Sequence, residues 1–176
     1  MDEIYELDST ALRLIPPEER AHSCCFTGHR EMSGETRRLL VPKLSELTLR
    51  LYTEGYRRFY VGGAYGFDLL AAAAVVAIIR SGCSDAELVF AYPFPGHDSR
   101  WSSADRELLA RLRSYAAEEI YVSQSYHPGA YAMRNRYMVE RSSACVAYYL
   151  AGREQSGTGQ TVRMAERAGH TIYRLP

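Results

Sequence analysis

The sequence predicts an α/β fold with a mainly parallel sheet of about six strands and helices on both of its faces. Short apolar runs alternate with segments of helical periodicity along nearly the whole chain. The helical segments are ten or more residues long, as crossovers between parallel strands require. No internal repeat or low-complexity segment interrupts the alternation. In such a sheet every strand-to-helix turn lies at the carboxyl edge, where ligands bind.

The strands are predicted from apolar runs that end in turn residues. They lie at residues 22–30, 57–64, 86–94, 118–125, 144–151 and 170–175. Helical segments connect them at residues 34–55, 66–82, 103–116, 129–142 and 157–169. The first of these helices has an apolar face formed by Leu39, Leu40, Leu44, Leu47 and Leu51. We expect this helix to end at Gly55 and to be kinked at Pro42.

Length and composition indicate one domain. The 176 residues are enough for a single core, and we assign residues 22–176 to it, with residues 1–21 as an N-terminal arm. The 21 basic residues balance the 21 acidic ones, so no net charge draws the protein toward nucleic acid or an anionic membrane. The acidic start MDEIYELDST lacks the apolar region of a signal peptide, and no apolar run has the length of a transmembrane helix. We therefore expect a cytoplasmic protein with no membrane partner.

The cysteines give no sign of a metal site. Cys24, Cys25 and Cys145 lie in or next to apolar strand-like runs, and Cys83 follows a helical segment. The chain has no CxxC pair, and no histidine stands at metal-ligand spacing from a cysteine. We expect buried, reduced thiols and neither a metal nor a required cofactor.

Three strand-to-helix turns, FTGHR, VGGAYGFD and SGTGQT, have a composition typical of ligand-binding turns. Glycines let the backbone approach a ligand closely, and each following helix offers free N–H groups and the positive end of its dipole. Each turn alone is equally typical of an ordinary tight turn, and neither a P-loop nor a GxGxxG motif is present. Together they favour a pocket for a nucleotide-like ligand. The candidate binding residues from these turns are Thr27, Gly28, His29, Arg30, Gly62, Gly63, Tyr65, Gly66, Asp68, Ser156, Gly157, Thr158, Gly159 and Thr161.

The helical segment 129–142 adds a cationic candidate. Arg134, Met138 and Arg141 are spaced to share one face of this helix. A guanidinium near the sheet edge can clamp a phosphate or a ribose-linked carboxylate. A solvated arginine face is the alternative interpretation of the same pattern.

Asp68 and two aromatic residues are weaker candidates. Asp68 can hold ribose hydroxyls or act only as a favourable charge at a helix N-terminus. Trp101 and Tyr65 are candidates for stacking on a base, although single aromatic residues commonly pack in a core or at its rim. His97, in the loop after the third strand, is a candidate for part of a lid.

With these motifs the chain resembles the SLOG superfamily, and specifically its YpsA-like branch. The resemblance rests, in order, on TGHR, GGAYGFDLLAA, YPF with the nearby Trp101, MRNRYMV and SGTGQT, and it covers roughly residues 23–174. It implies a Rossmann-like sheet that binds a nucleotide or nucleotide-derived ligand at its carboxyl edge. It also implies kinship with the LOG-type phosphoribohydrolases and with the DprA-type proteins that handle single-stranded DNA.

The LOG pattern combines an arginine–lysine pair and a methionine with PGGxGTxxE, and its arginine and final glutamate serve cleavage of an N-glycosidic bond. By this resemblance Arg134 matches the arginine, and Asn135 stands at the lysine position. Met138 matches the methionine, and Gly157 and Thr158 match the GT pair. Thr161 stands at the position of the glutamate, so the catalytic carboxylate of that pattern is missing.

The sequence therefore favours a binding protein over an enzyme. We expect a sensor or regulatory module for ADP-ribose, NAD or a nucleoside monophosphate, and the resemblance adds a homodimer as a further expectation. The first alternative is a phosphoribohydrolase in which Asp68 and Arg134 are catalytic, with Glu140 a weaker source of the carboxylate. The second is DprA-like binding of single-stranded DNA by a basic face that contains Arg37, Arg38, Arg57 and Arg58. Zero net charge counts against this last alternative.

Overall fold

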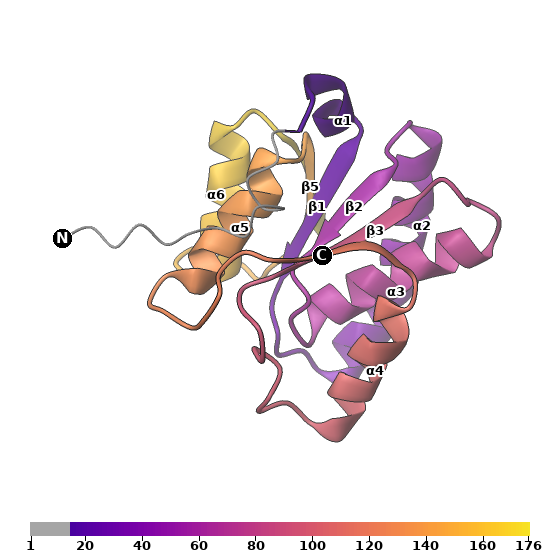
Figure 1. The fold of residues 1–176 in the computed structure, drawn as a ribbon. Coiled ribbons are helices and arrows are strands. Elements are labelled where there is room, and N and C mark those ends of the chain that lie inside the picture. The colour runs from indigo at the N-terminus through magenta and orange to yellow at the C-terminus, as the bar shows by residue number, and fades with distance from the viewer. Residues whose placement is uncertain (1–14) are drawn as a thin grey trace.

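Six parallel strands form one sheet in the order β4-β3-β2-β1-β5-β6 in the computed structural model, which describes residues 15–176 (Figure 1). The strands are β1 (Ser23–Gly28), β2 (Arg58–Val61), β3 (Glu87–Tyr92), β4 (Ala116–Tyr121), β5 (Ala144–Tyr148) and β6 (Thr171–Leu175). Each of the five neighbouring pairs is parallel. The predicted parallel α/β fold is confirmed.

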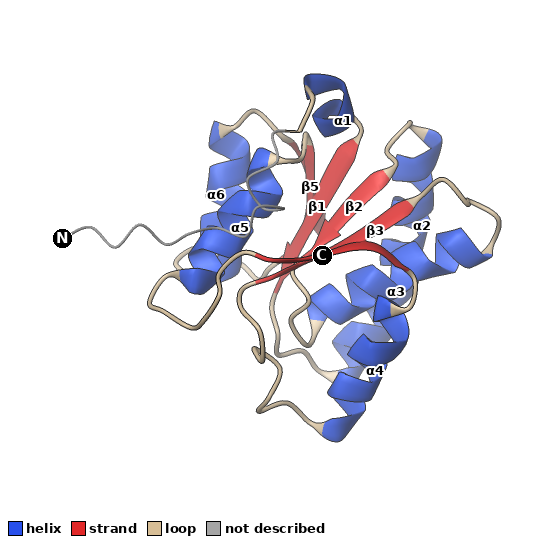
Figure 2. Cartoon of the chain, in the orientation of Figure 1, coloured by secondary structure: helices blue, strands red, loops and turns tan. Residues whose placement is uncertain are grey.

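Helices cover both faces of this sheet. They are α1 (Pro17–Ala21), α2 (Gly34–Thr53), α3 (Phe67–Arg80), α4 (Ser103–Arg113), α5 (Ala130–Glu140) and α6 (Gly157–Arg167). Figures 1 and 2 show α2, α3 and α4 on one side of the strands and α5 and α6 on the other. From β1 to β4 the chain adds each strand on the same side of the last, so right-handed crossovers place their helices on one face. It then returns to add β5 beside β1, and the helices change face.

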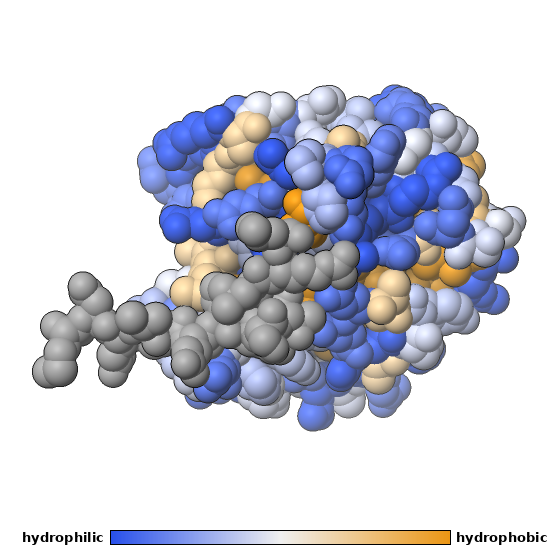
Figure 3. Space-filling view, turned by 45° about the horizontal axis from the view of Figure 1, so that its top comes forward, coloured by the Kyte–Doolittle hydropathy of each residue, from blue (hydrophilic) through white to orange (hydrophobic). Residues whose placement is uncertain are grey.

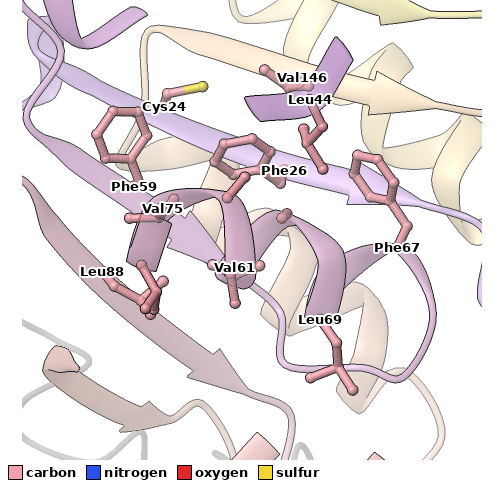
Figure 4. Close-up of a cluster of buried hydrophobic side chains, with 14 of the residues drawn as sticks. Cys24, Phe26, Leu44, Phe59, Val61, Phe67, Leu69, Val75, Leu88 and Val146 are labelled. Carbon is pink, nitrogen blue, oxygen red and sulfur yellow. The ribbon is translucent and has the colours of Figure 1, made fainter. Parts of the chain in front are cut away.

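The apolar strands are explained by burial on both sides. Successive side chains of a strand point to opposite faces, so Cys24 and Phe26 belong to the core under α2–α4, whereas Cys25 belongs to the core under α5 and α6. Figure 4 shows part of the first core, where Phe26, Phe59 and Val61 of the sheet lie close to Leu44, Phe67 and Val75 of the helices. As predicted, Cys24, Cys25 and Cys145 are buried free thiols, whereas Cys83, which was also expected to be buried, is only half-buried.

The first predicted helix differs in detail from α2. Leu40, Leu44, Leu47 and Leu51 are buried as expected, but the side chain of Leu39 is 59% exposed. Consecutive helical residues are about 100° apart around the axis, so Leu39 and Leu40 cannot both face the core. The helix runs unbroken through Pro42, which lies on the exposed side, and ends at Thr53.

The predicted N-terminal arm, residues 1–21, falls mostly on residues 1–14, which lie outside the described part of the chain. Its last residues form α1, where Nε of Arg20 donates to the carbonyl of Ser142 at 3.0 Å. Glu19 of α1 lies 3.5 Å from Arg58 at the start of β2. The side of the molecule toward α1 is mostly hydrophilic, as Figure 3 shows in blue. Within residues 15–176, no helix has the length and apolar character needed to cross a membrane.

Candidate ligand-binding cleft at the carboxyl edge of the sheet

A cleft of about 300 Å³ opens at the carboxyl edge, between the ends of β1 and β5. This is the point where the strand order reverses, and ligands of open α/β sheets bind at such switch points. The turn after β1, the turn after β2, helix α5 and the start of α6 contribute to the walls. The lining residues are Phe26, Thr27, Gly28, His29, Arg30, Ala64, Asp68, Tyr131, Arg134, Asn135, Met138, Ser156, Gly157 and Thr158.

A buried ion pair forms the floor of the cleft. Asp68, in the first turn of α3, and Arg134, in α5, are each only 5% exposed, and Nη1 of Arg134 lies 3.9 Å from Oδ2 of Asp68. The backbone N–H of Ala64 donates to the same carboxylate oxygen at 3.2 Å. Nη1 of Arg134 also donates to the carbonyl of Gly62, and its Nε donates to Oδ1 of Asn135 at 2.7 Å.

Burial dominates the electrostatics of this pair. It raises the pKa of Asp68 above its ordinary value, although Arg134 and the N–H of Ala64 oppose the shift. It also lowers the pKa of Arg134, whose main opposing influence is Asp68. Both charges of the floor have therefore lost water. Among the described residues Asp68 has gained only two protein contacts, both at Oδ2, and a ligand with hydroxyl groups can supply more.

The start of α6 forms one wall. The side chain of Ser156 caps the helix by accepting the N–H of Gly159 at 3.1 Å, which leaves the N–H groups of Gly157 and Thr158 without a protein partner among the described residues. The first turn of α6 contains no acidic side chain that would neutralise the positive end of the helix dipole.

The hydroxyl groups of two largely buried threonines line the same space. The residues Thr27, at the end of β1, and Thr158, in α6, are 6% and 7% exposed. Neither hydroxyl forms a hydrogen bond with another residue of the described chain. Free N–H groups and free hydroxyls on one wall are suited to binding phosphate oxygens.

Arg30 and Tyr131 lie at the rim. The guanidinium carbon of Arg30 lies 4.9 Å from the ring centre of Tyr131 and 5.6 Å from that of Tyr65, and the Arg30 side chain is exposed. Nε2 of His29 accepts the N–H of Leu150 at 3.2 Å, which requires the neutral ring at that nitrogen. Burial, followed by the nearby Arg153, lowers the pKa of His29 and favours this form.

Several predicted glycines shape the turns rather than line the cleft. Gly66 has a φ of +83°, and a Cβ there would collide with the carbonyl oxygen of Arg30. A Cβ on Gly62 would collide with the guanidinium of Arg134. At Gly28, which does line the cleft, it would collide with the ring of Phe67. The close approach of Arg134 to the end of β2 therefore depends on a glycine at position 62.

The predicted site residues divide into two groups. Those brought together around the cleft are Thr27, Gly28, His29, Arg30, Asp68, Arg134, Asn135, Ser156, Gly157 and Thr158. Those that do not line it are Gly62, Gly63, Tyr65, Gly66, Trp101, Gly159 and Thr161. Trp101 instead makes edge contacts with Tyr65 and His97, at ring-centre distances of 5.5 and 5.4 Å. The hydroxyl of Thr161 is buried and donates to the carbonyl of Gly157 at 2.8 Å, within α6.

Four lining residues were not among the sequence-based candidates: Phe26, Ala64, Tyr131 and Met138. Tyr131 and Met138 had a usable signal, because they stand three residues before and four residues after Arg134 and thus share its helix face. Phe26 and Ala64 stand within the turns FTGHR and VGGAYGFD, but their apolar side chains gave no sign of ligand binding, and only the folded arrangement places them at the cleft.

The predicted basic face is not formed. Arg37 and Arg38 lie near the start of the 20-residue helix α2, and Arg57 and Arg58 follow its other end, so roughly 20–25 Å of helix axis lies between the two pairs. Arg57 pairs with Asp85 at 2.7 Å. Arg58 pairs with Glu87 at 2.5 Å and also with Glu118 and Glu19. Acidic partners thus neutralise the second pair of arginines. Within residues 15–176, no cluster of three or more His, Cys, Asp or Glu side chains is placed to hold a metal ion.

Comparison with known proteins agrees with this architecture. Residues 25–175 match the YpsA family model, described as the YspA SLOG family. The chain is 30% identical over 159 residues to the protein named "Uncharacterized SPbeta prophage-derived protein YoqJ" of Bacillus subtilis (strain 168), across 82% of this chain and 91% of that one.

A solved structure shares the fold. DNA processing protein A from Helicobacter pylori, described as binding single-stranded DNA, superposes with a TM-score of 0.63 over 96% of this chain and 69% of that chain. Its sequence identity of 16% makes this a likeness of fold alone. Since the family match spans nearly the whole described chain and agrees with the resemblance found in the sequence, the protein belongs to the YspA SLOG family.

Proposed function

We propose that the cleft binds a nucleotide or a nucleotide-derived ligand, of the ADP-ribose, NAD or nucleoside monophosphate type. The observation that carries this proposal is the convergence at the switch point of three kinds of group: N–H groups and threonine hydroxyls that have no partner among the described residues, and a buried cation. The N–H groups belong to Gly157 and Thr158, the hydroxyls to Thr27 and Thr158, and the cation to Arg134.

Each part of such a ligand has a suitable partner. A phosphate at the start of α6 accepts hydrogen bonds from the N–H groups of Gly157 and Thr158, and the positive end of the helix dipole stabilises its charge. Ribose hydroxyls donate to Asp68. Among the described residues only its Oδ2 atom has partners in the protein, so Oδ1 is open to a ligand. At the rim, the Arg30 guanidinium and the Tyr131 ring offer flat surfaces to a base. The protein would then act as a cytoplasmic sensor or regulatory module.

A phosphoribohydrolase is the second candidate, and the buried carboxylate of Asp68 favours it. In that reaction the oxygen of water bonds to C1′ of the ribose as the C1′–N bond breaks, and a proton passes to the leaving base. Burial raises the pKa of Asp68, which keeps its carboxyl group protonated, and so able to donate a proton, to a higher pH than a carboxyl group in water. Thr161 adds nothing to this chemistry, because its hydroxyl is buried inside α6.

Thermal unfolding with AMP, ADP-ribose, NAD and a short single-stranded oligonucleotide tests the proposal. A ligand at a hundred times its dissociation constant adds about 2.7 kcal/mol to the stability of the folded state. For a domain of this size the midpoint then rises by roughly 5–10 °C. Release of adenine from AMP, abolished by Asp68→Asn, would favour the hydrolase instead. A shift with the oligonucleotide alone would reject the small nucleotide.

Two threonines of α6 provide a matched pair of variants. Thr158→Val removes a hydroxyl that lines the cleft and keeps the side-chain shape, so we expect about 10- to 100-fold weaker binding of the phosphorylated ligand. Thr161→Val removes a hydroxyl that is equally buried, one turn away, but faces the helix. Its affinity should stay near that of the wild type. Equal losses in the two variants would argue against a phosphate at the start of α6.

A further inference from the structure

A second hollow, of about 720 Å³, lies between the outer side of α2 and the edge strand β6. Leu49, Arg50 and Thr53 line it from the helix, and Tyr173 and Leu175 line it from the strand. β6 is the last strand of the sheet and pairs only with β5, so its other edge has no strand partner among the described residues. Native proteins usually cover or blunt an edge of this kind.

The outer side of α2 has the pattern of a helix that packs on both sides. Leu39, Pro42, Glu46, Leu49 and Thr53 follow one another at spacings of three and four residues, and all are exposed. Leu39 and Leu49 are 59% and 46% exposed, which places two large apolar side chains on the face opposite the core leucines.

Two charged side chains of this surface, Lys43 and Glu46, have no ion-pair partner in the described chain. Arg50 pairs with Glu54 at 3.5 Å and lies 5.4 Å from the ring centre of Tyr173. Lys43 and Glu46, by contrast, form neither an ion pair nor a side-chain hydrogen bond with residues 15–176, although both line the hollow. They are three residues apart and have opposite charges, so the surface offers one charge of each sign without an ion-pair partner among residues 15–176.

These features make the surface complementary to itself. Two α2 helices can pack antiparallel through their outer sides, about a twofold axis that crosses the helix at the level of residue 44. Leu39 of one copy then meets Leu49 of the other. In the same register Lys43 of one copy lies beside Glu46 of the other, and each contact occurs twice. We propose that this surface, formed by the outer side of α2 and by β6, binds a second copy of the chain in a symmetric dimer.

Charge reversal tests this register directly. The molar mass of the full chain is measured by light scattering and sedimentation across a concentration series. Wild type should be dimeric, whereas Lys43→Glu and Glu46→Lys should each raise the dimer dissociation constant about tenfold or more, because each places like charges together twice. An equimolar mixture of the two variants should restore the dimer. In the mixed pair the two substituted side chains face each other with opposite charges, and the unchanged Glu46 of one variant faces the unchanged Lys43 of the other.

Arg111→Glu, on the exposed side of α4, makes the same change of charge as Lys43→Glu far from this surface and should leave the dimer unchanged. All three substituted chains keep their core, so thermal unfolding should show near-wild-type midpoints at low concentration. A wild type that stays monomeric overturns the proposal. So does a dimer that tolerates both reversals, or a mixture that fails to recover.

Discussion

Asp68 and Arg134 belong to helices on opposite faces of the sheet, yet their charged groups lie 3.9 Å apart at the floor of one cleft. They meet because the sheet ends there: α3 begins just after β2, and α5 passes the ends of the central strands. A carboxylate and a guanidinium that lie far apart in the sequence thereby share one buried, water-poor environment.

The raised pKa of Asp68 predicts a pH dependence of stability. A carboxyl group with a higher pKa in the folded than in the unfolded chain stabilises the fold below its ordinary pKa of 3.8, and this contribution is lost as the pH rises through the folded value. In Asp68→Asn no group ionises at this position, so the variant does not lose this stability as the pH rises. The free energy of unfolding of the variant, relative to wild type, should therefore increase between acidic and neutral pH in urea titrations. A relative decrease would mean that Arg134 outweighs burial.

Two positions in α2 should respond very differently to truncation. Leu44 is 1% exposed in the core, so Leu44→Ala should lower the free energy of unfolding by about 2–5 kcal/mol. Val41 is 44% exposed on the same helix, and Val41→Ala should change it by less than about 0.5 kcal/mol. Urea denaturation of both variants measures the difference. Similar costs would contradict the assigned buried face.

Gly66 should tolerate no side chain. Its φ of +83° and the carbonyl of Arg30 oppose a Cβ, so Gly66→Ala should destabilise the fold by about 1–3 kcal/mol. Gly34, at the start of α2, has open space around its Cβ position, and Gly34→Ala should be neutral or stabilising by up to about 1 kcal/mol. Thermal unfolding compares the two. If Gly66→Ala lowered the stability only slightly, the turn after β2 would have to be able to rearrange.

The four thiols should differ in reactivity. Burial raises the pKa of Cys24 well above its ordinary value. Cys25 and Cys145 are also fully buried, whereas Cys83 is half-buried. Because the thiolate is the reactive form, a thiol reagent should modify Cys83 first in the native protein and all four cysteines after denaturation. Mass spectrometry identifies the modified residue, and rapid native labelling of Cys25 would contradict this order.

Local sequence patterns predicted the strands and helices closely, because amphipathic spacing and turn residues act over a few neighbours. The one strand with a clear shift is β4, expected at residues 118–125 and found at Ala116–Tyr121. It is an edge strand whose Ala117 and Glu119 are exposed, so its sequence lacks the continuous apolar run of the central strands. Leu39 shows the same limit, since apolar character alone does not say which side of a helix faces the core.

Local patterns were enough to predict the elements, the three glycine-containing turns and the presence of Asp68 and Arg134 near strand ends. The folded chain was needed to show that these residues surround one cleft with Tyr131, and that Trp101 and Thr161 do not line it. The physical reason is that strand order and helix face depend on long-range crossovers and packing, which no local pattern encodes. The reversal of strand order between β1 and β5 brings the turn after β1 and the start of α6 together.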